Sequence, residues 1–369
     1  RPNWFSDRPD DSAVPTFRRA NWFEPVAREC RMVTNGVGLA DMSVLSKFEV
    51  RGPDARAFVD ALGCNRAPGP GRLALTYALT PAGGTESEFT VACLAEDHFY
   101  LTSAAAAEMR DDDLLRARAA GFDVAIARVT EDWAVIAMMG PKAPDVLARL
   151  TDARPAPWMH VEPMTVAGIA LRALRLSYVG EAGWELHVPA ASAGALFDAL
   201  ERAGQPEGIG CFGAHAMNAM RLEKGYAAWG ADFTTERTPA ESGMGFLVKP
   251  DHSFVGREAL LARMADPGRW ELVLIEIAQG AADPFHAHGL WQGTRCVGIV
   301  TSAAHGHRTG MTLALAYLRD REARSGLEVD VLGRRRAARI LARPPFDPDN
   351  LRPRARLMAP DAPAVMAGG

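Results

Sequence analysis

A carboxylate on a glycine-containing turn is the first feature that could do chemistry. In the segment LSYVGEAGWEL, residues 176–186, one apolar strand ends, the chain turns around Glu181, and a second strand begins. A carboxylate can accept two parallel hydrogen bonds from an N–C–N edge, such as that of the 2-aminopyrimidinone ring of a pterin. The segment therefore suggests a ring-binding site, and the competing interpretation is a solvated hairpin turn.

An arginine on a predicted helix is the second candidate. The segment MNAMRLEKGY, residues 217–226, places Arg221 among small and apolar residues and ends near Gly225, a residue type that commonly follows a helix C-terminus. A guanidinium can bind a carboxylate through two hydrogen bonds, as the glutamate tail of a folate would require. The alternative is a structural ion pair with Glu223 or another acidic residue.

The third candidate is Glu88, on a predicted hairpin. Strands are expected at 73–80 and 87–94, joined by the turn PAGG, whose glycines permit the positive φ of a tight reversal. Side chains alternate along a strand, so Phe89 and Val91 share one face and Glu88 lies on the other. Glu88 therefore points away from the apolar side, where it is either a site residue or a solvated strand residue.

The elements that must position these residues form a mixed α and β pattern. Helical periodicity is expected at 143–150, 191–203, 213–226 and 257–264, and a further helix begins with Asp54 as its N-cap. Strands are expected at 48–50, 99–102 and 133–139. The remainder is strand-rich, at 270–277, 297–301, 313–317, 327–331 and 337–342, which predicts a small β-barrel or sandwich from about residue 266.

Composition narrows the classes of partner. The 369 residues carry 41 Lys and Arg against 45 Asp and Glu, so a net charge of −4 gives no general attraction to nucleic acid or to an anionic membrane. No apolar run reaches the roughly 18 residues of a membrane span. The five cysteines are scattered, as in a reduced protein. These features predict a cytoplasmic location and a small-molecule substrate.

Motifs for other cofactors are missing from the sequence. It contains no GxGxxG strand-to-helix turn and no GxxxxGK[ST] loop, so neither a flavin nor a nucleotide is expected in this chain. The pairs His286/His288 and His305/His307 lack an acidic or cysteine companion at suitable spacing, so no metal is predicted. No GxSxG motif is present, which disfavours a hydrolase.

Taken in order, the motifs GGTESEFTV, GPKAPDVL, SYVGEAGWELHVP, RLEKGY, TPAESGMGFLV and FVGREAL resemble the aminomethyltransferase (T-protein) family of the glycine cleavage system. They are most similar to the folate domain of dimethylglycine and sarcosine dehydrogenases. The resemblance implies an α+β fold, a three-domain cloverleaf around a central folate cavity with a C-terminal β-barrel. The expected divisions are an aromatic linker at 1–22, two interleaved α+β domains at 23–265, the barrel at 266–350 and a flexible tail at 351–369.

The resemblance also implies roles for single residues. Tetrahydrofolate is the expected cofactor, and its contacts are expected at Glu181, Arg221, Tyr100, Tyr178 and Trp184. The catalytic aspartate of the family falls on Glu88, whose extra methylene keeps the charge but moves it by about 1.5 Å, enough to change a proton-handling geometry. A related iron–sulfur branch carries a cysteine after the equivalent of Gly225, and Tyr226 follows here instead, which disfavours that branch.

The predicted function is capture of a methyl-derived carbon, as an iminium or formaldehyde from an N-methyl amine, to give 5,10-methylenetetrahydrofolate. In this interpretation the chain, which begins at Arg1, is the folate half of a dehydrogenase-like system whose flavin-dependent half is a separate domain or subunit. Two alternatives stay open: a stand-alone folate-dependent demethylase that takes a methyl group directly from N, O or S, and a non-catalytic folate-binding regulatory module. The sequence does not identify the one-carbon donor.

Overall fold

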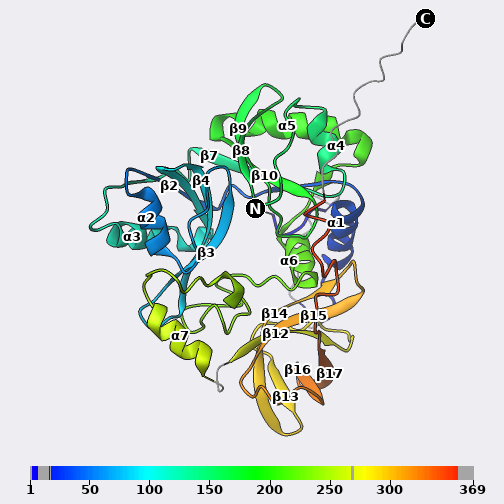
Figure 1. Cartoon of the computed structure of the whole chain (residues 1–369). Coiled ribbons are helices and arrows are strands. Elements are labelled where there is room, and N and C mark those ends of the chain that lie inside the picture. Colours follow the sequence, from blue (N-terminus) through cyan, green and yellow to red (C-terminus); the bar gives the residue numbers. More distant parts are fainter. Residues whose placement is uncertain (1, 7–15, 17, 267–269, 356–369) are drawn as a thin grey trace, which may run out of the picture.

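Two sheets with their helices and one barrel make up the part of the chain that the structure describes (Figure 1). The computed structural model describes residues 2–6, 16, 18–266 and 270–355. The α+β fold class and the C-terminal barrel expected from the sequence are both confirmed. No helix in the described part of the chain is long and apolar enough to cross a membrane.

The first sheet has six strands, in the order β11-β1-β7-β10-β9-β8. Their bounds are Gly210–Cys211, Gly38–Asp41, Trp133–Met139, Gly183–Pro189, Ile169–Leu174 and Val161–Val166. Along the apolar strand β7, Ile136 and Met138 pack in one cluster and Val135 and Ala137 in another, as expected for a strand buried on both faces. One face is covered by α4 (Ala143–Ala148) and α5 (Ala193–Gly204), and the other in part by α1 (Phe23–Asn35) and α6 (Ala214–Glu223).

The second sheet has five strands, in the order β3-β4-β5-β2-β6. Their bounds are Leu73–Leu79, Thr85–Ala95, His98–Ser103, Ser46–Arg51 and Ala125–Arg128. Phe89 and Val91 pack beneath α2 (Ala55–Leu62) and α3 (Glu108–Arg118), which confirms the predicted alternation along the hairpin. The opposite face contacts the first sheet, where Tyr100 packs with Leu174 of β9.

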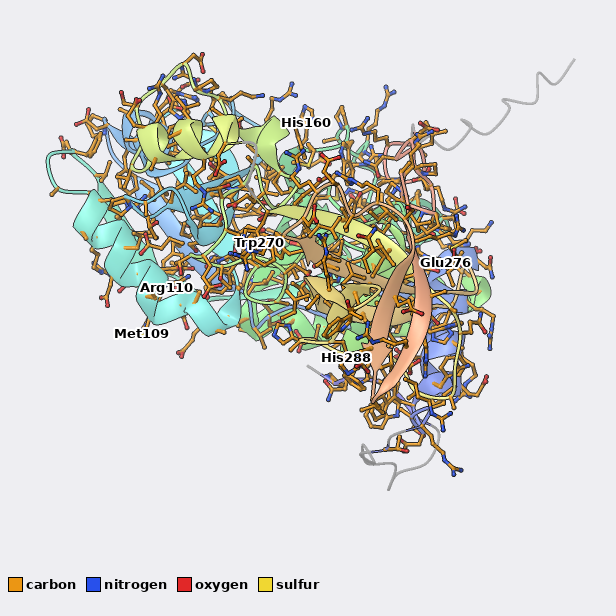
Figure 2. The ribbon with its side chains drawn as sticks, turned by 90° about the horizontal axis from the view of Figure 1, so that it is seen from below. Met109, Arg110, His160, Trp270, Glu276 and His288 are labelled. Carbon is orange, nitrogen blue, oxygen red and sulfur yellow. The ribbon has the colours of Figure 1, made fainter. Side chains whose placement is uncertain are left out.

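The third unit is a closed barrel, in the order β12-β15-β14-β13-β16-β17. Its strands are Glu271–Ile277, Met311–Leu318, Arg295–Gly306, Gly289–Gln292, Leu327–Val331 and Arg334–Ile340, and α7 (Arg257–Ala265) precedes it. Seen from below, the barrel with Glu276 on β12 and helix α3 with Arg110 lie toward opposite sides of the molecule (Figure 2).

The segments at both ends of the chain are tied to this body where they are described. Trp4 and Trp22 both stack on His215 of α6, at centroid distances of 5.9 and 4.9 Å. Much of the predicted linker and residues 356–369 of the predicted tail lie outside the described residues. At the start of the predicted tail, Arg352 Nε donates to Glu181 at 2.6 Å.

Candidate functional site

A pocket of about 250 Å³ lies where the two sheets meet. Its walls come from β4 and β5 of the second sheet, from β10 and the segment before it in the first, and from the loop after α6. The lining residues are Met42, Leu45, Glu88, Thr90, Thr102, Ser103, Ala104, Leu176, Tyr178, Glu185, Ala228 and Trp229. Two carboxylates, one from each sheet, thus share a pocket that also has apolar and aromatic walls.

Glu88 lines this pocket from β4, half-buried and in register with Tyr77 of β3. Burial raises the pKa of its carboxyl to about 7, because a charge is poorly solvated there. The nearby Tyr77 hydroxyl lowers the pKa of Glu88 and so offsets part of this rise. A carboxyl group with this pKa can exchange protons near neutral pH, as a general acid or base must.

Glu185 is a pocket carboxylate that the sequence analysis did not predict as a site residue. It follows Trp184 on β10, and Trp184 is fully buried in the cluster beneath α4 and α5. Since neighbouring side chains on a strand project from opposite faces, Glu185 faces the pocket. Within the described chain, its side chain makes one hydrogen-bonding contact, 3.4 Å to His187 Nε2. The alternation of side chains along WELHVP was the available signal.

Two aromatic side chains supply the flat surfaces of the pocket. Tyr178, predicted to bind folate, lines it and directs its hydroxyl to the carbonyl oxygen of Ala227 at 3.4 Å. Trp229 lies on the loop after α6, and its Nε1 is buried without a partner among the described residues. The Arg110 guanidinium stacks over the Trp229 ring, 4.5 Å from the centroid. Trp229 can therefore offer a donor to a ligand acceptor.

Glu181, the predicted pterin contact, is not among the residues that line this pocket. Both of its carboxylate oxygens face arginines: Oε2 accepts from Arg352 Nε at 2.6 Å, and Oε1 lies 3.5 Å from Arg308 Nη1. The carboxylate is fully buried, and burial raises its pKa while the two arginines lower it. Its observed contacts are those of a structural ion pair.

Arg221 is likewise held by the protein rather than directed into the pocket. Its Nη1 donates to Asp232 Oδ2 at 2.6 Å and to the Tyr226 carbonyl at 2.8 Å, and its Nε donates to Asn218 at 3.0 Å. Both members of the Arg221–Asp232 pair are buried. Of the two interpretations open at the sequence level, these contacts favour the structural ion pair, although with Asp232 instead of Glu223.

Tyr100 and Trp184 also lie outside the pocket lining. Tyr100 is fully buried between the sheets, and its hydroxyl oxygen lies 3.0 Å from His187 Nδ1. Trp184 is fully buried on the far face of the first sheet. The structure thus brings Glu88 and Tyr178 together in one pocket and places the other four predicted contacts elsewhere.

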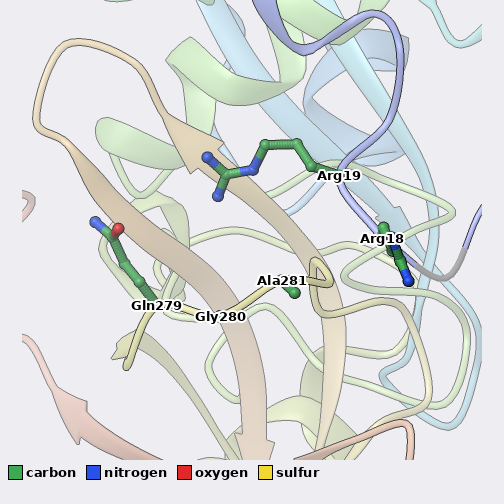
Figure 3. A pocket seen from close by; sticks show the side chains of 5 residues that line it. All are labelled: Arg18, Arg19, Gln279, Gly280 and Ala281. Carbon is green, nitrogen blue, oxygen red and sulfur yellow. The ribbon is translucent and has the colours of Figure 1, made fainter.

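Two other hollows lack this combination of groups. The larger, about 670 Å³, is a broad surface depression lined by Arg18, Arg19, Gln279, Gly280 and Ala281, with Arg19 extending across it (Figure 3). Another, of about 290 Å³, lies between α1, α6 and the barrel and contains His305 and His307. In the described part of the chain, no three His, Cys, Asp or Glu residues are grouped so that they could hold a metal ion.

Comparison with known proteins agrees with this architecture. Residues 1–252 match the GCVT N-terminal domain, and residues 271–347 match the glycine cleavage T-protein C-terminal barrel domain. The human mitochondrial dimethylglycine dehydrogenase is 34% identical over 355 residues, which cover 93% of this chain but 41% of that protein. The chain thus spans about two fifths of the length of that relative.

Shorter proteins match along most of their length. An aminomethyltransferase from Streptomyces avermitilis is 32% identical over 323 residues, covering 85% of this chain and 87% of the relative. The crystal structure of the glycine cleavage system aminomethyltransferase T from Bartonella henselae superposes with a TM-score of 0.80 at 22% identity, covering 91% of this chain and 94% of that one. From the two domain matches and these relatives, we conclude that the chain belongs to the glycine cleavage T-protein family.

Proposed function

We propose that this chain is a tetrahydrofolate-dependent one-carbon transferase that uses the pocket between its two sheets. The observation that carries the proposal is the meeting of Glu88 and Glu185 in that pocket, one carboxylate from each sheet. One carboxylate is suited to bind a pterin edge and the other to accept a proton. The folate roles first expected of Glu181 and Arg221 pass to the residues that line the pocket.

The lining fits the head of a folate. A pterin is flat and bicyclic, with N–H donors along one edge and a carbonyl oxygen beside them. Glu185 supplies the acceptor for the N–H edge, Trp229 Nε1 supplies an unused donor, and Tyr178 adds an aromatic surface. Pockets for drug-sized ligands usually measure about 300–1,000 Å³, so 250 Å³ suits the ring system with the tail left outside.

Glu88 is the proposed proton acceptor. Tetrahydrofolate supplies the nucleophilic amine nitrogens that take up the one-carbon unit. Each amine nitrogen that adds to the iminium or formaldehyde carbon loses its proton, and the Glu88 carboxylate accepts it. The bond from that carbon to the donor nitrogen or oxygen breaks, and the leaving group takes up a proton and departs as an amine or as water. With a pKa of about 7, Glu88 is deprotonated in about half of the molecules at neutral pH and still basic enough to accept a proton.

The one-carbon donor is proposed from the relatives. Dimethylglycine dehydrogenase, a relative of more than twice this length, is named for an N-methyl amine substrate. We therefore propose a donor derived from an N-methyl amine, delivered as an iminium or formaldehyde by a flavin-dependent domain or subunit. Direct transfer of a methyl group without such a partner is the competing function, and the activity of Glu88→Asp distinguishes the two.

Tetrahydrofolate should raise the melting temperature of the purified chain. A ligand that binds only the folded state stabilises it by about 2.7 kcal/mol at one hundred times its dissociation constant. Differential scanning fluorimetry with tetrahydrofolate, and with FAD as the control, measures the effect. An unchanged melting curve at saturating folate, or a shift with FAD instead, would contradict the proposed function.

Glu185→Gln should weaken tetrahydrofolate binding about 10- to 100-fold. An amide has only one acceptor oxygen and no charge, so it cannot accept charge-assisted hydrogen bonds from both nitrogens of the pterin edge. Glu181→Gln is the matched control, because Glu181 lies on the turn just before β10 and is paired with Arg352 and Arg308. It should lower stability and leave the affinity of the folded protein for folate unchanged. Isothermal titration calorimetry on both variants decides the assignment, and the reverse pattern would return the pterin contact to Glu181.

A further inference from the structure

Behind the pocket, three polar side chains connect one sheet to the other. Glu185 and His187 lie two residues apart on β10 and project from the same face, and Tyr100 projects toward them from β5. His187 Nε2 lies 3.4 Å from Glu185 Oε2, and His187 Nδ1 lies 3.0 Å from the Tyr100 hydroxyl oxygen. His187 and Tyr100 are fully buried, and of the three only Glu185 lines the pocket.

The direction of these hydrogen bonds follows from the chemistry of the groups. A neutral imidazole carries one N–H, and a carboxylate only accepts. His187 therefore donates from Nε2 to Glu185, and its Nδ1 accepts from the Tyr100 hydroxyl. Burial lowers the pKa of His187 and raises that of Tyr100, so the ring stays neutral and the hydroxyl keeps its proton.

The far end of this chain of hydrogen bonds is itself fixed in place. The Arg172 guanidinium lies over the Tyr100 ring, 4.7 Å from its centroid, and Arg172 Nη2 donates to Glu49 at 2.7 Å. The Tyr100 and His187 rings meet edge to face, with an interplanar angle of 85°. The contacts of the Tyr100 ring with Arg172 and His187 restrict its rotation. The hydrogen bond from Tyr100 therefore holds the imidazole in the orientation in which Nε2 faces Glu185.

We propose that His187 and Tyr100 are positioning residues: the hydrogen bond from His187 to one oxygen of Glu185 orients the carboxylate, whose remaining lone pairs on both oxygens can accept from the edge of a reduced pterin. The proposal rests on the proposed function, since it assigns Glu185 to the folate. Neither residue touches the ligand or the reacting atoms. They act by restricting the carboxylate to the orientation that binding requires, which lowers the loss of side-chain freedom on binding.

Tyr100→Phe tests the proposal with the smallest change, because it removes only the hydroxyl. The dissociation constant for tetrahydrofolate should rise about 5- to 20-fold, the worth of one buried hydrogen bond and the freedom that it removes. Turnover at saturating folate should stay close to that of the wild type, since Glu88 is untouched. Tyr317→Phe is the matched control: a buried barrel tyrosine that loses a 2.9 Å contact with Ser242, with no expected change in folate affinity.

A double-mutant cycle with Glu185→Ala shows whether the effect passes through Glu185. Once the carboxylate is gone, Tyr100→Phe should produce no further loss of affinity. An equal loss in both backgrounds, or wild-type affinity in Tyr100→Phe, would overturn the positioning role and leave the proposed function intact if Glu185→Ala still weakens binding. Failure of the wild-type protein to bind tetrahydrofolate would overturn both. Should Tyr100→Phe not fold, His187→Gln gives the same comparison and should retain more affinity than His187→Ala.

Discussion

Glu88→Gln should lower turnover about 10²- to 10⁴-fold while leaving the affinity for tetrahydrofolate nearly unchanged, the usual range for removal of a general acid or base. The amide keeps the size of the side chain in the pocket but cannot accept a proton. Turnover is measured as 5,10-methylenetetrahydrofolate formed from the product of a flavin-dependent N-methyl amine dehydrogenase, after subtraction of the uncatalysed reaction. Undiminished turnover would remove Glu88 from the mechanism.

The pH dependence gives an independent check on the same residue. Because the carboxylate is the active form, wild-type turnover should rise with pH up to about 7, the pKa of Glu88, and then level off. Stability should show the opposite trend. Between the ordinary glutamate pKa of 4.5 and about 7, the unfolded chain loses this proton before the folded one, so wild type should lose up to about 3 kcal/mol relative to Glu88→Gln.

Glu88→Asp separates the two proposed donors. Aspartate withdraws the carboxylate by about 1.5 Å, and a shift of this size can change a rate about 10²-fold. If the pocket retains the geometry of the family aspartate, Glu88→Asp keeps or improves activity with an iminium or formaldehyde. If the pocket is instead built around glutamate for direct demethylation, the aspartate carboxylate does not reach the methyl donor, and the demethylation activity falls.

Arg221→Ala should destabilise the protein by about 3–5 kcal/mol, because it leaves the Asp232 carboxylate buried without its cation. Asp232 still accepts from the Ala228 amide and from Thr301, but neither donor carries a charge. Chemical denaturation measures the loss. Arg339→Ala, which breaks an exposed pair with Glu276, is the matched control and should cost less than about 1 kcal/mol.

Two further measurements distinguish a structural Arg221 from a folate-binding one. Adding Asp232→Asn to Arg221→Ala removes the uncompensated charge, so the double variant should be more stable than Arg221→Ala alone. The folded Arg221→Ala protein should bind a glutamate-bearing folate and a bare pterin with equal losses. A loss confined to the glutamate-bearing ligand would show that Arg221 contacts the tail after all.

Much of the fold could be predicted from local patterns. Short segments were enough to predict the hairpin around Glu88, the apolar strand at 133–139 and the strand-rich C-terminal part. In each of them the spacing of apolar residues indicates which side chains are buried. Asp54 shows a limit, because it stands at the N-cap position of α2 but its carboxylate accepts from the Asp123 amide instead of capping the helix. When a side chain has two possible hydrogen-bond partners, tertiary contacts decide which one it takes, and a local sequence pattern does not contain those contacts.

The site was harder to predict for the same reason. Glu181 and Glu185 lie on one short segment, and only the placement of Arg308 and Arg352, more than a hundred residues away, shows that Glu181 is already engaged. The ion pair of Arg221 with Asp232 likewise depends on a residue outside the helix, which the helical pattern does not contain. The direction of Glu88 was predictable because alternation along its strand fixes it, and the same signal was available for Glu185.

The contact between Arg352 and Glu181 bears on how this architecture can be inherited. The segment after the last barrel strand returns to the first sheet, where Arg352 meets Glu181 and Asp347 meets Lys224. Exchanging the barrel for that of another protein would leave the buried charges of Glu181 and Lys224 without these partners, unless the returning segment came from the original chain. Recombination that joins this architecture to other proteins is therefore expected to preserve it as one cassette, with the sheets, the barrel and the returning segment passed on together.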